Sequence, residues 1–119
     1  MTRVLVVDDE VDIRLLTRLI LEGAGYDVME AADGVAALRH IEGGGVDVVL
    51  LDIRMAGMDG WEVIEALDER GLSTIPVIVF SAHVEPEVRA SAVERGCVGV
   101  LAKPFTTEEC LAAVRDALA

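Results

Sequence analysis

Aromatic residues are scarce in this chain: they make up 3% of its 119 residues, with one Trp, one Tyr and two Phe. The core must therefore be aliphatic, and a hydrophobic content of 53% excludes a disordered chain. Only two cysteines occur, Cys97 and Cys110, which excludes the disulfide framework of small secreted domains. We expect both thiols to be reduced.

Long apolar runs and basic residues are also lacking. No run approaches the roughly 20 residues that span a bilayer, and no signal peptide follows Met1. Ten basic residues face 22 acidic ones, which gives a formal net charge of −12. Such a surface repels nucleic acid and anionic lipid, so we expect this chain to bind neither directly. We predict a cytoplasmic protein that works with protein partners and divalent cations.

Short apolar runs alternate with stretches of helical periodicity along the chain. The runs cover residues 4–7, 26–31, 46–51, 76–80 and 98–102. Runs that are apolar on both faces are typical of buried parallel strands. No linker, repeat or low-complexity tract separates them, so we predict one domain over residues 1–119.

A helix is expected after each run. Asp33 can cap the second, which ends near Glu42, and Thr106 begins a capping box before the fifth. The apolar stripes are Leu15, Leu16, Leu19 and Ile20 in the first helix, Trp61, Ile64 and Leu67 in the third, Val84, Val88 and Ala92 in the fourth, with Pro86 in its first turn, and Leu111, Val114 and Leu118 in the fifth. Right-handed crossovers then give a doubly wound α/β three-layer sandwich around a five-stranded parallel sheet.

Polar residues end four of the predicted strands. Asp8 and Asp9 follow the first, Asp52 the third, Ser81 the fourth and Lys103 the fifth. The carboxyl ends of parallel strands form one edge, where ligands bind in such sheets. Lys103 is also the only lysine in the chain, beside nine arginines.

Three carboxylates brought together repel one another unless a cation lies between them. Hard oxygen ligands suit Mg²⁺, which is commonly held by one or two carboxylates together with phosphate oxygens. Phosphoryl transfer needs chiefly position and charge neutralisation, which a metal and Lys103 supply here. A carboxylate in this group can act as the nucleophile, and Ser81 can donate a hydrogen bond to a phosphoryl oxygen.

Four segments at these strand ends resemble the receiver domains of bacterial response regulators. They are Asp8-Asp9, the stretch DIRMAGMDG from Asp52 to Gly60, Ser81-Ala82 and Lys103-Pro104-Phe105. The resemblance covers the whole chain in the expected order and spacing. It implies a flavodoxin-like (βα)5 fold with strand order 2-1-3-4-5, and a phosphoacceptor signalling domain rather than an enzyme, although one that assists its own phosphorylation and slow dephosphorylation.

The resemblance also implies roles for individual residues. Asp52 accepts the phosphoryl group from a sensor histidine kinase, a histidine phosphotransfer protein or a small donor such as acetyl phosphate. Asp9, Asp52 and the backbone carbonyl of Arg54 ligate Mg²⁺ or Mn²⁺, and Asp8 acts through a metal-bound water. Lys103 pairs with the acids and then with the phosphoryl group, and its bond to Pro104 is cis.

Further implied roles concern the switch. Ser81 is the switch hydroxyl, and the backbone amide of Ala82 helps to bind the phosphoryl group. The family usually has Tyr or Phe where this chain has Val100, so the relay from Ser81 is expected to be smaller or to follow another path. Arg54 and His83 are candidates for tuning the dephosphorylation rate. Ala56 replaces a common family proline, with little expected effect.

Several alternatives stay open. A flavodoxin-like cofactor binder has the same sheet order but usually a Ser/Thr/Gly-rich phosphate loop where this chain has Asp8-Asp9-Glu10. An aspartyl phosphatase usually carries a cap insertion. A receiver that serves only as a docking surface or phosphate sink is a further possibility, as is a dimer that forms on phosphorylation. A single-domain regulator and a receiver joined to an output domain or hybrid kinase both fit. Asp8 and Asp9 as helix-capping acids, Ser81 as a turn residue and His83 as a solvated loop residue are the plainer readings.

Overall fold

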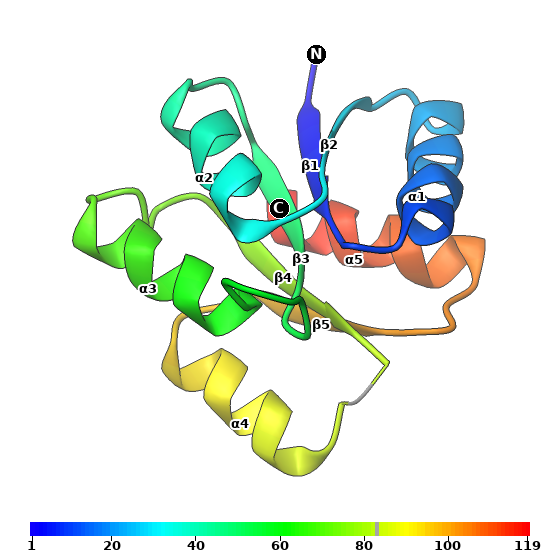
Figure 1. Ribbon diagram of the computed structural model, residues 1–119. Helices are drawn as coiled ribbons and strands as arrows, with labels where there is room; N and C mark the ends of the chain where they lie inside the picture. Colours follow the sequence, from blue (N-terminus) through cyan, green and yellow to red (C-terminus); the bar gives the residue numbers. More distant parts are fainter. Residues whose placement is uncertain (83) are drawn as a thin grey trace.

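The computed structural model describes every residue except His83, and the described chain alternates five strands with five helices (Figure 1). The proposed tuning role of His83 lies outside the described residues. The strands are β1 (Arg3–Val7), β2 (Asp27–Ala31), β3 (Val48–Asp52), β4 (Val77–Ser81) and β5 (Gly99–Ala102). The helices are α1 (Val11–Gly23), α2 (Gly34–Glu42), α3 (Gly60–Glu69), α4 (Pro86–Glu94) and α5 (Thr107–Leu118).

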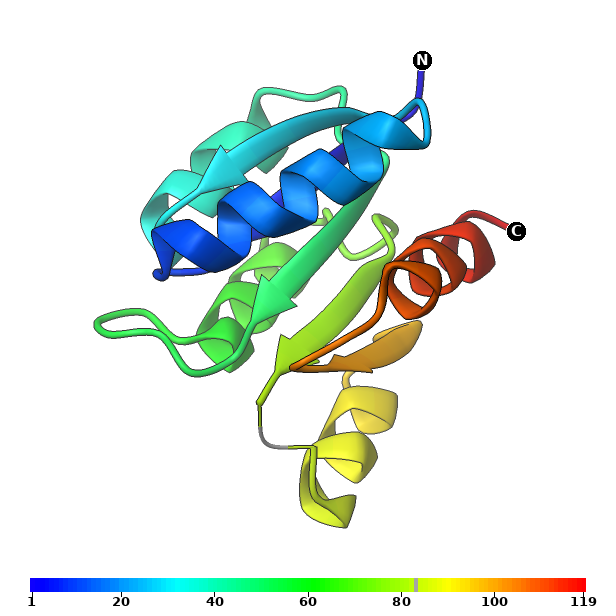
Figure 2. The same ribbon diagram turned by 90° about the vertical axis from the view of Figure 1, so that its right-hand side faces the viewer.

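All neighbouring strands of the sheet are parallel, in the order β2-β1-β3-β4-β5, which confirms the predicted topology. Val7 pairs with both Ala31 and Leu51, so the three strands on that side end at the same level. On the other side Ser81 pairs with Ala102. The arrowheads therefore point to one edge of the sheet (Figure 2).

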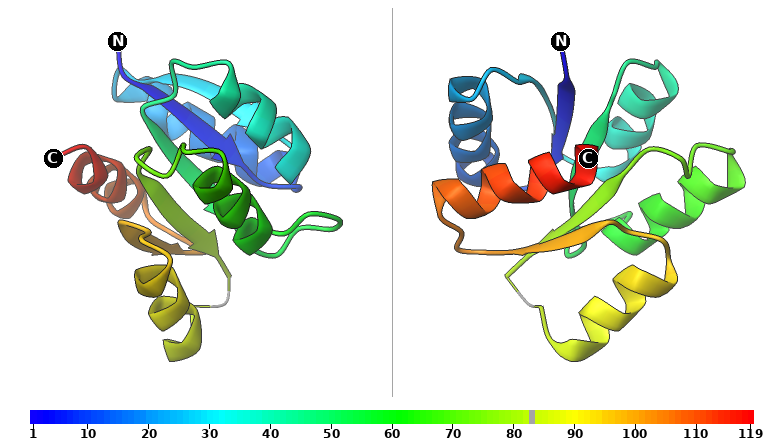
Figure 3. Two further views of the ribbon diagram at one scale, coloured as in Figure 1. Left: turned by 90° about the vertical axis from the view of Figure 1, so that its left-hand side faces the viewer. Right: turned by 180° about the vertical axis from the view of Figure 1, so that it is seen from behind.

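The helices cover both faces of the sheet: α1 and α5 lie on one face, and α2, α3 and α4 on the other (Figure 3). Every residue of β3 and β4 is buried, as expected for central parallel strands. Phe80 is fully buried on the α1 and α5 face and packs against Phe105, with ring centroids 5.5 Å apart. None of the described helices has both the length and the hydropathy to cross a membrane.

The packed face of α1 differs from the predicted stripe. The exposed fraction is 52% for Leu15, 48% for Leu16 and 60% for Leu19, whereas Thr17 and Leu21 are fully buried. The prediction was therefore wrong for these three leucines. It passed over Thr17, whose hydroxyl donates a hydrogen bond to the carbonyl of Ile13 at 2.7 Å and so can be buried at low cost.

The helix starts follow the capping chemistry. Asp33 accepts a hydrogen bond from the amide of Ala36, and Thr106 and Glu109 form the predicted capping box. A second capping box, which the sequence reading missed, joins Asp59 to Glu62 at the start of α3. The apolar stripe predicted for the fourth helix is wrong at its first residue, Val84.

Val84 precedes α4, which begins at Pro86 with Glu85 as its N-cap. Pro fits the first turn because it has no amide hydrogen to donate there. Val84 is therefore not part of the helical stripe, although Val88 and Ala92 do face the sheet. Only Ala92 of α4 is buried, so this helix contributes less to the core than the others do.

Gly60 allows the start of α3 to lie against the end of β3. A Cβ atom at this position would lie 2.6 Å from the carbonyl oxygen of Asp52 and 2.6 Å from the Cα of Ile53. Both are backbone atoms, so they cannot move aside as a flexible side chain could. The close approach places the α3 start directly behind the predicted site.

We expect Gly60→Ala to lower the free energy of unfolding by about 2 kcal/mol, because the added methyl overpacks a backbone contact. Gly23→Ala is the matched control, since nothing lies within 4 Å of its added Cβ, and should stabilise the fold by about 0.5 kcal/mol. Urea denaturation measures both changes. Equal effects of the two substitutions would contradict this account.

Candidate functional site

The carboxyl edge of the sheet brings four of the predicted site residues together. Asp8 follows β1, Asp52 ends β3, Ser81 ends β4 and Lys103 follows β5. Their burial is far greater than that of ordinary surface polar groups: Asp8 is 0%, Ser81 1% and Asp52 4% exposed. The strand ends thus form a polar cluster within an otherwise apolar sheet. Asp9 is exposed beside this cluster.

The ammonium of Lys103 lies among the buried carboxylates. It donates a hydrogen bond to Oδ2 of Asp8 and lies 3.5 Å from Oδ2 of Asp52. Only 10% of the Lys103 side chain is exposed, and its Nζ lies 4.5 Å from the centroid of the Phe80 ring. The carboxylates offset the cost of burying this charge, and the aromatic face adds a favourable contact.

The backbone holds Lys103 in place at the end of β5. Its amide donates to the carbonyl of Ser81 at 2.9 Å, which extends the pairing of β4 and β5 by one residue. The Lys103–Pro104 peptide bond is cis, as the sequence analysis predicted. The lysine is therefore positioned by strand pairing rather than by a free loop.

The carboxylate of Asp52 is held at one oxygen by the backbone. Its Oδ1 accepts a hydrogen bond from the amide of Arg54 at 2.9 Å, which orients Oδ2 toward Lys103. Burial raises the pKa of Asp52, the Arg54 amide and the Lys103 charge lower it, and Asp8 and Asp9 raise it. The net direction is upward from the ordinary value of 3.8.

Carboxylate oxygens gather closely at the end of β1. Among the described residues, ligand atoms of Asp8, Asp9 and Glu10 all lie within 4.8 Å of one another. The sequence analysis did not predict Glu10 as a member of this group, because a third consecutive acid reads as a helix-start residue. Asp52 does not belong to this close group. Its proposed place among the metal ligands therefore stays a prediction.

The donor set fits a hard divalent cation. Carboxylate oxygens are the ligands that Mg²⁺ prefers, and it commonly keeps several waters beside them. The carboxylates of Asp8, Asp9, Glu10 and Asp52 outnumber the single positive charge of Lys103. The excess charge is negative, so a bound divalent cation would relieve the repulsion among these acids.

The predicted switch residues lie on the β4 and β5 side of the edge. Ser81 is buried, and Ala82 beside it is exposed. Val100 is half-buried and packs against the small cluster of Ile53, Val79 and Ala92 beneath α4. Ile53 directly follows Asp52, so this cluster connects the predicted site to α4 through packed side chains.

Replacing Asp52 with Asn should raise the free energy of unfolding at pH 7 in Mg²⁺-free buffer by about 1 kcal/mol, an ordinary size for one substitution. Because its pKa is raised on folding, the folded chain keeps the proton to higher pH than the unfolded chain does. The contribution of Asp52 to stability therefore falls as pH rises above 3.8 and through the raised pKa.

Urea denaturation from pH 3 to pH 8 measures this difference. The stability gained by Asp52→Asn should disappear near pH 3, the acid end of this range, because Asp52 of the wild type is then protonated in both the folded and the unfolded chain. Asp116→Asn, which removes an exposed acid from α5, is the control and should change little. An Asn variant that is no more stable than the wild type at pH 7 would argue against an unfavourable buried charge.

Known proteins with similar sequences and the same fold share one family description. The chain matches the response regulator receiver domain family over residues 4–115. It is 40% identical over 118 residues to the transcriptional regulatory protein KdpE of Mycobacterium tuberculosis, which covers 99% of this chain and 51% of that protein. It is 35% identical to the DNA-binding transcriptional regulator NtrC of Escherichia coli, covering 95% of this chain and 24% of that protein. The chain thus spans about half the length of KdpE and a smaller part of NtrC.

Solved structures agree with the sequence relatives. The chemotaxis protein CheY4 of Vibrio cholerae superposes with a TM-score of 0.93 and 33% identity, and the match covers 99% of each chain. The receiver match favours a phosphoacceptor signalling domain over the cofactor-binding alternative. With the family matched over residues 4–115 and the acid, serine and lysine positions gathered at one edge, this chain belongs to the response regulator receiver domains of two-component signal transduction.

Proposed function

We propose that Asp52 is the residue that accepts the phosphoryl group. The observation that carries this proposal is the burial of its carboxylate, 4% exposed, beside the Lys103 ammonium and next to the gathered acids of the β1 end. An oxygen of Asp52 attacks the phosphorus, a new O–P bond forms, and the bond from phosphorus to the donor atom breaks. The donor is a phosphohistidine or a small molecule such as acetyl phosphate.

The chain's own groups prepare Asp52 for this attack. The Arg54 amide holds Oδ1 at 2.9 Å, so that the other oxygen faces Lys103. Lys103 neutralises charge at the acid cluster and is placed to pair with the phosphoryl oxygens after transfer. Because both groups are fixed before the donor arrives, little reorganisation is needed during transfer.

A divalent cation, Mg²⁺ or Mn²⁺, would be held by Asp9, Asp52 and the backbone carbonyl of Arg54, with Asp8 acting through a water. Glu10 is an additional candidate because its carboxylate gathers with Asp8 and Asp9. When bound, the cation neutralises negative charge on the phosphoryl oxygens and aligns them.

The proposed switch begins at Ser81, whose hydroxyl donates to a phosphoryl oxygen while the amide of Ala82 binds another. The movement is passed to Val100 and α4, and the small aliphatic side chain of Val100 makes this relay weaker than an aromatic one. Arg54, exposed beside Asp52, and His83 tune dephosphorylation. The receiver is a phosphoacceptor and not an enzyme acting on other substrates.

The partners follow from this chemistry. Receiver domains of response regulators interact with histidine kinases and output domains. For this chain we propose a sensor histidine kinase or histidine phosphotransfer protein as donor, and a downstream protein or output domain as target. The acidic charge of −12 favours protein partners over direct contact with nucleic acid or membrane. Two free thiols fit a cytoplasmic setting.

Residues 1–119 form one receiver domain in this proposal. The relatives KdpE and NtrC are named as regulators of transcription, and the matched region is only part of each. A phosphate sink, a docking surface and a phosphorylation-dependent dimer are alternative outputs of the same domain.

We expect the wild type, incubated with Mg²⁺ and acetyl phosphate, to gain one phosphoryl group by intact mass spectrometry. Asp52→Asn should gain none, because the nucleophilic oxygen is replaced by an amide. Asp47→Asn is the matched control, since Asp47 precedes the same strand at the opposite edge of the sheet and should be labelled like the wild type. Equal labelling of Asp52→Asn and the wild type would sink the assignment.

Val100→Tyr should strengthen the coupling between phosphorylation and α4. The tyrosine ring is larger than the valine side chain and extends the contact from this face of β5 to α4. Amide chemical shifts of residues 87–94 report the coupling, and their change on phosphorylation should grow in the variant. Val98→Tyr places the same ring at a position that is 53% exposed, and should leave the coupling unchanged. Equal shifts in the wild type and Val100→Tyr would count against this relay.

A further inference from the structure

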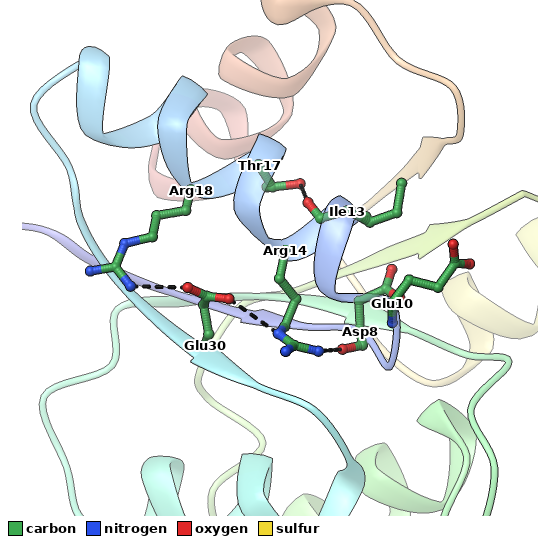
Figure 4. A network of polar contacts seen from close by, with 7 residues as sticks. All are labelled: Asp8, Glu10, Ile13, Arg14, Thr17, Arg18 and Glu30. Atoms are coloured by element: carbon green, nitrogen blue, oxygen red, sulfur yellow. Dashed lines mark hydrogen bonds and ion pairs between the residues drawn. The ribbon is translucent and has the colours of Figure 1, made fainter.

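Arg14 in α1 contacts the backbone of the proposed site. Its Nη1 donates a hydrogen bond to the carbonyl oxygen of Asp8 at 2.7 Å, and its Nε donates to Oε1 of Glu30 on β2 at 3.1 Å (Figure 4). Only 15% of the Arg14 side chain is exposed. The planar guanidinium thus joins the end of β1 to the edge strand β2, a fork geometry that a lysine does not reproduce.

Asp8 is held at each of its hydrogen-bonding groups. Its amide donates to the carbonyl of Ala31 at 3.1 Å, its Oδ1 accepts from the amide of Glu10 at 2.9 Å, and its Oδ2 pairs with Lys103. Arg14 satisfies the remaining group, the carbonyl. This contact is made by a side chain outside the set that the sequence assigned to the site.

The carbonyl that Arg14 holds belongs to the peptide unit between Asp8 and Asp9. Fixing the plane of this peptide fixes the direction in which the chain leaves β1, and therefore where the carboxylates of Asp9 and Glu10 are presented. These are the acids whose oxygens gather within 4.8 Å of one another and of Asp8. Buried backbone carbonyls are rarely left without a partner, so loss of Arg14 would allow this peptide to reorient.

We propose that Arg14 is a positioning residue for the divalent-cation site, which it preorganises by anchoring the Asp8–Asp9 peptide to Glu30. The inference rests on the cation site of the proposed function. Groups that orient metal ligands from outside the coordination shell commonly affect metal affinity as strongly as some ligands do. Arg14 has this relation to the gathered acids, since it reaches them through the backbone that carries them.

The positive charge of Arg14 allows a positioning role to be distinguished from a purely electrostatic one. A cation near a cation site repels the incoming metal, so electrostatics alone predict tighter Mg²⁺ binding when Arg14 is removed. Positioning predicts the opposite, because the acids lose their common orientation. The direction of the change in affinity therefore distinguishes the two effects.

Arg18 provides a matched control on the next turn of α1. Its Nη1 donates to Oε2 of Glu30 at 2.9 Å (Figure 4). Its Nε donates to Oε2 of Glu22 at 3.2 Å. Arg18 therefore has the same charge and shares the same acid on β2, but its ion pairs are directed away from the Asp8 carbonyl. Removing Arg18 takes away one positive charge and its own contact with Glu30. The hydrogen bond from Arg14 to the Asp8 carbonyl stays in place.

The experiment is a Mg²⁺ titration of the wild type, Arg14→Met, Arg14→Lys and Arg18→Met, followed by the amide shifts of Asp9 and Glu10. We expect Arg14→Met to weaken Mg²⁺ binding about tenfold, and Arg14→Lys to weaken it similarly although the charge is kept. Arg18→Met should stay within about twofold of the wild type. Urea denaturation checks that all four proteins are folded. If Arg14→Met proves too unstable, Glu30→Gln replaces it. This variant keeps Arg14 but weakens its anchor, and it should also bind Mg²⁺ more weakly than the wild type.

Tighter or unchanged binding in Arg14→Met, or in Glu30→Gln where Arg14→Met does not fold, overturns the inference. An equal loss in Arg18→Met also overturns it. Labelling of the wild type with acetyl phosphate separates this from the proposed function: a wild type that binds Mg²⁺ but is not labelled at Asp52 sinks the proposed function and leaves Arg14 as a positioning residue. A wild type that binds no Mg²⁺ overturns the inference together with the proposed cation site.

Discussion

The ammonium of Lys103 lies buried between the carboxylates of Asp8 and Asp52, and the polar edge of the sheet depends on this contact. Burying any one of these charges alone would cost several kcal/mol. Together they offset one another in part, and the contact pulls three separate strand ends toward one point. The sheet must end in register there, because Lys103 reaches both acids only if β1, β3 and β5 finish at the same level.

The apolar sheet makes this polar cluster rigid. Each central strand is buried on both faces, so a shift by one residue would move every side chain to the opposite face and disrupt its packing. Phe80 adds a direct link, since its ring packs in the core and faces the Lys103 ammonium. Rigid strands below and excess negative charge above are the conditions under which a hard cation and a phosphoryl group can be held without large rearrangement.

The two sides of the edge have different supports. The acids at the β1 end are held by backbone hydrogen bonds and by the ion pairs of α1 with Glu30 on β2. The β4 and β5 side leads through Ile53 and Val100 to α4, a helix with a single buried residue. Asp52 therefore lies between the well-anchored acids at the β1 end and the more weakly packed helix α4. This asymmetry supports the proposal that α4 is the element that responds.

The sequence by itself determined the alternation of strands and helices, and with it the edge at which Asp8, Asp52, Ser81 and Lys103 meet, because apolar runs that end in polar residues carry this information locally. Its resemblance to receiver domains supplied the strand order. The tertiary structure decided which residues of α1 face the core, where Thr17 replaced the expected leucines because its hydroxyl is satisfied within the helix. It also decided the partners of Arg14 and the gathering of Glu10 with the other acids. These contacts depend on how β2 and α1 lie in space, and residues sixteen positions apart, such as Arg14 and Glu30, show no local pattern that would pair them.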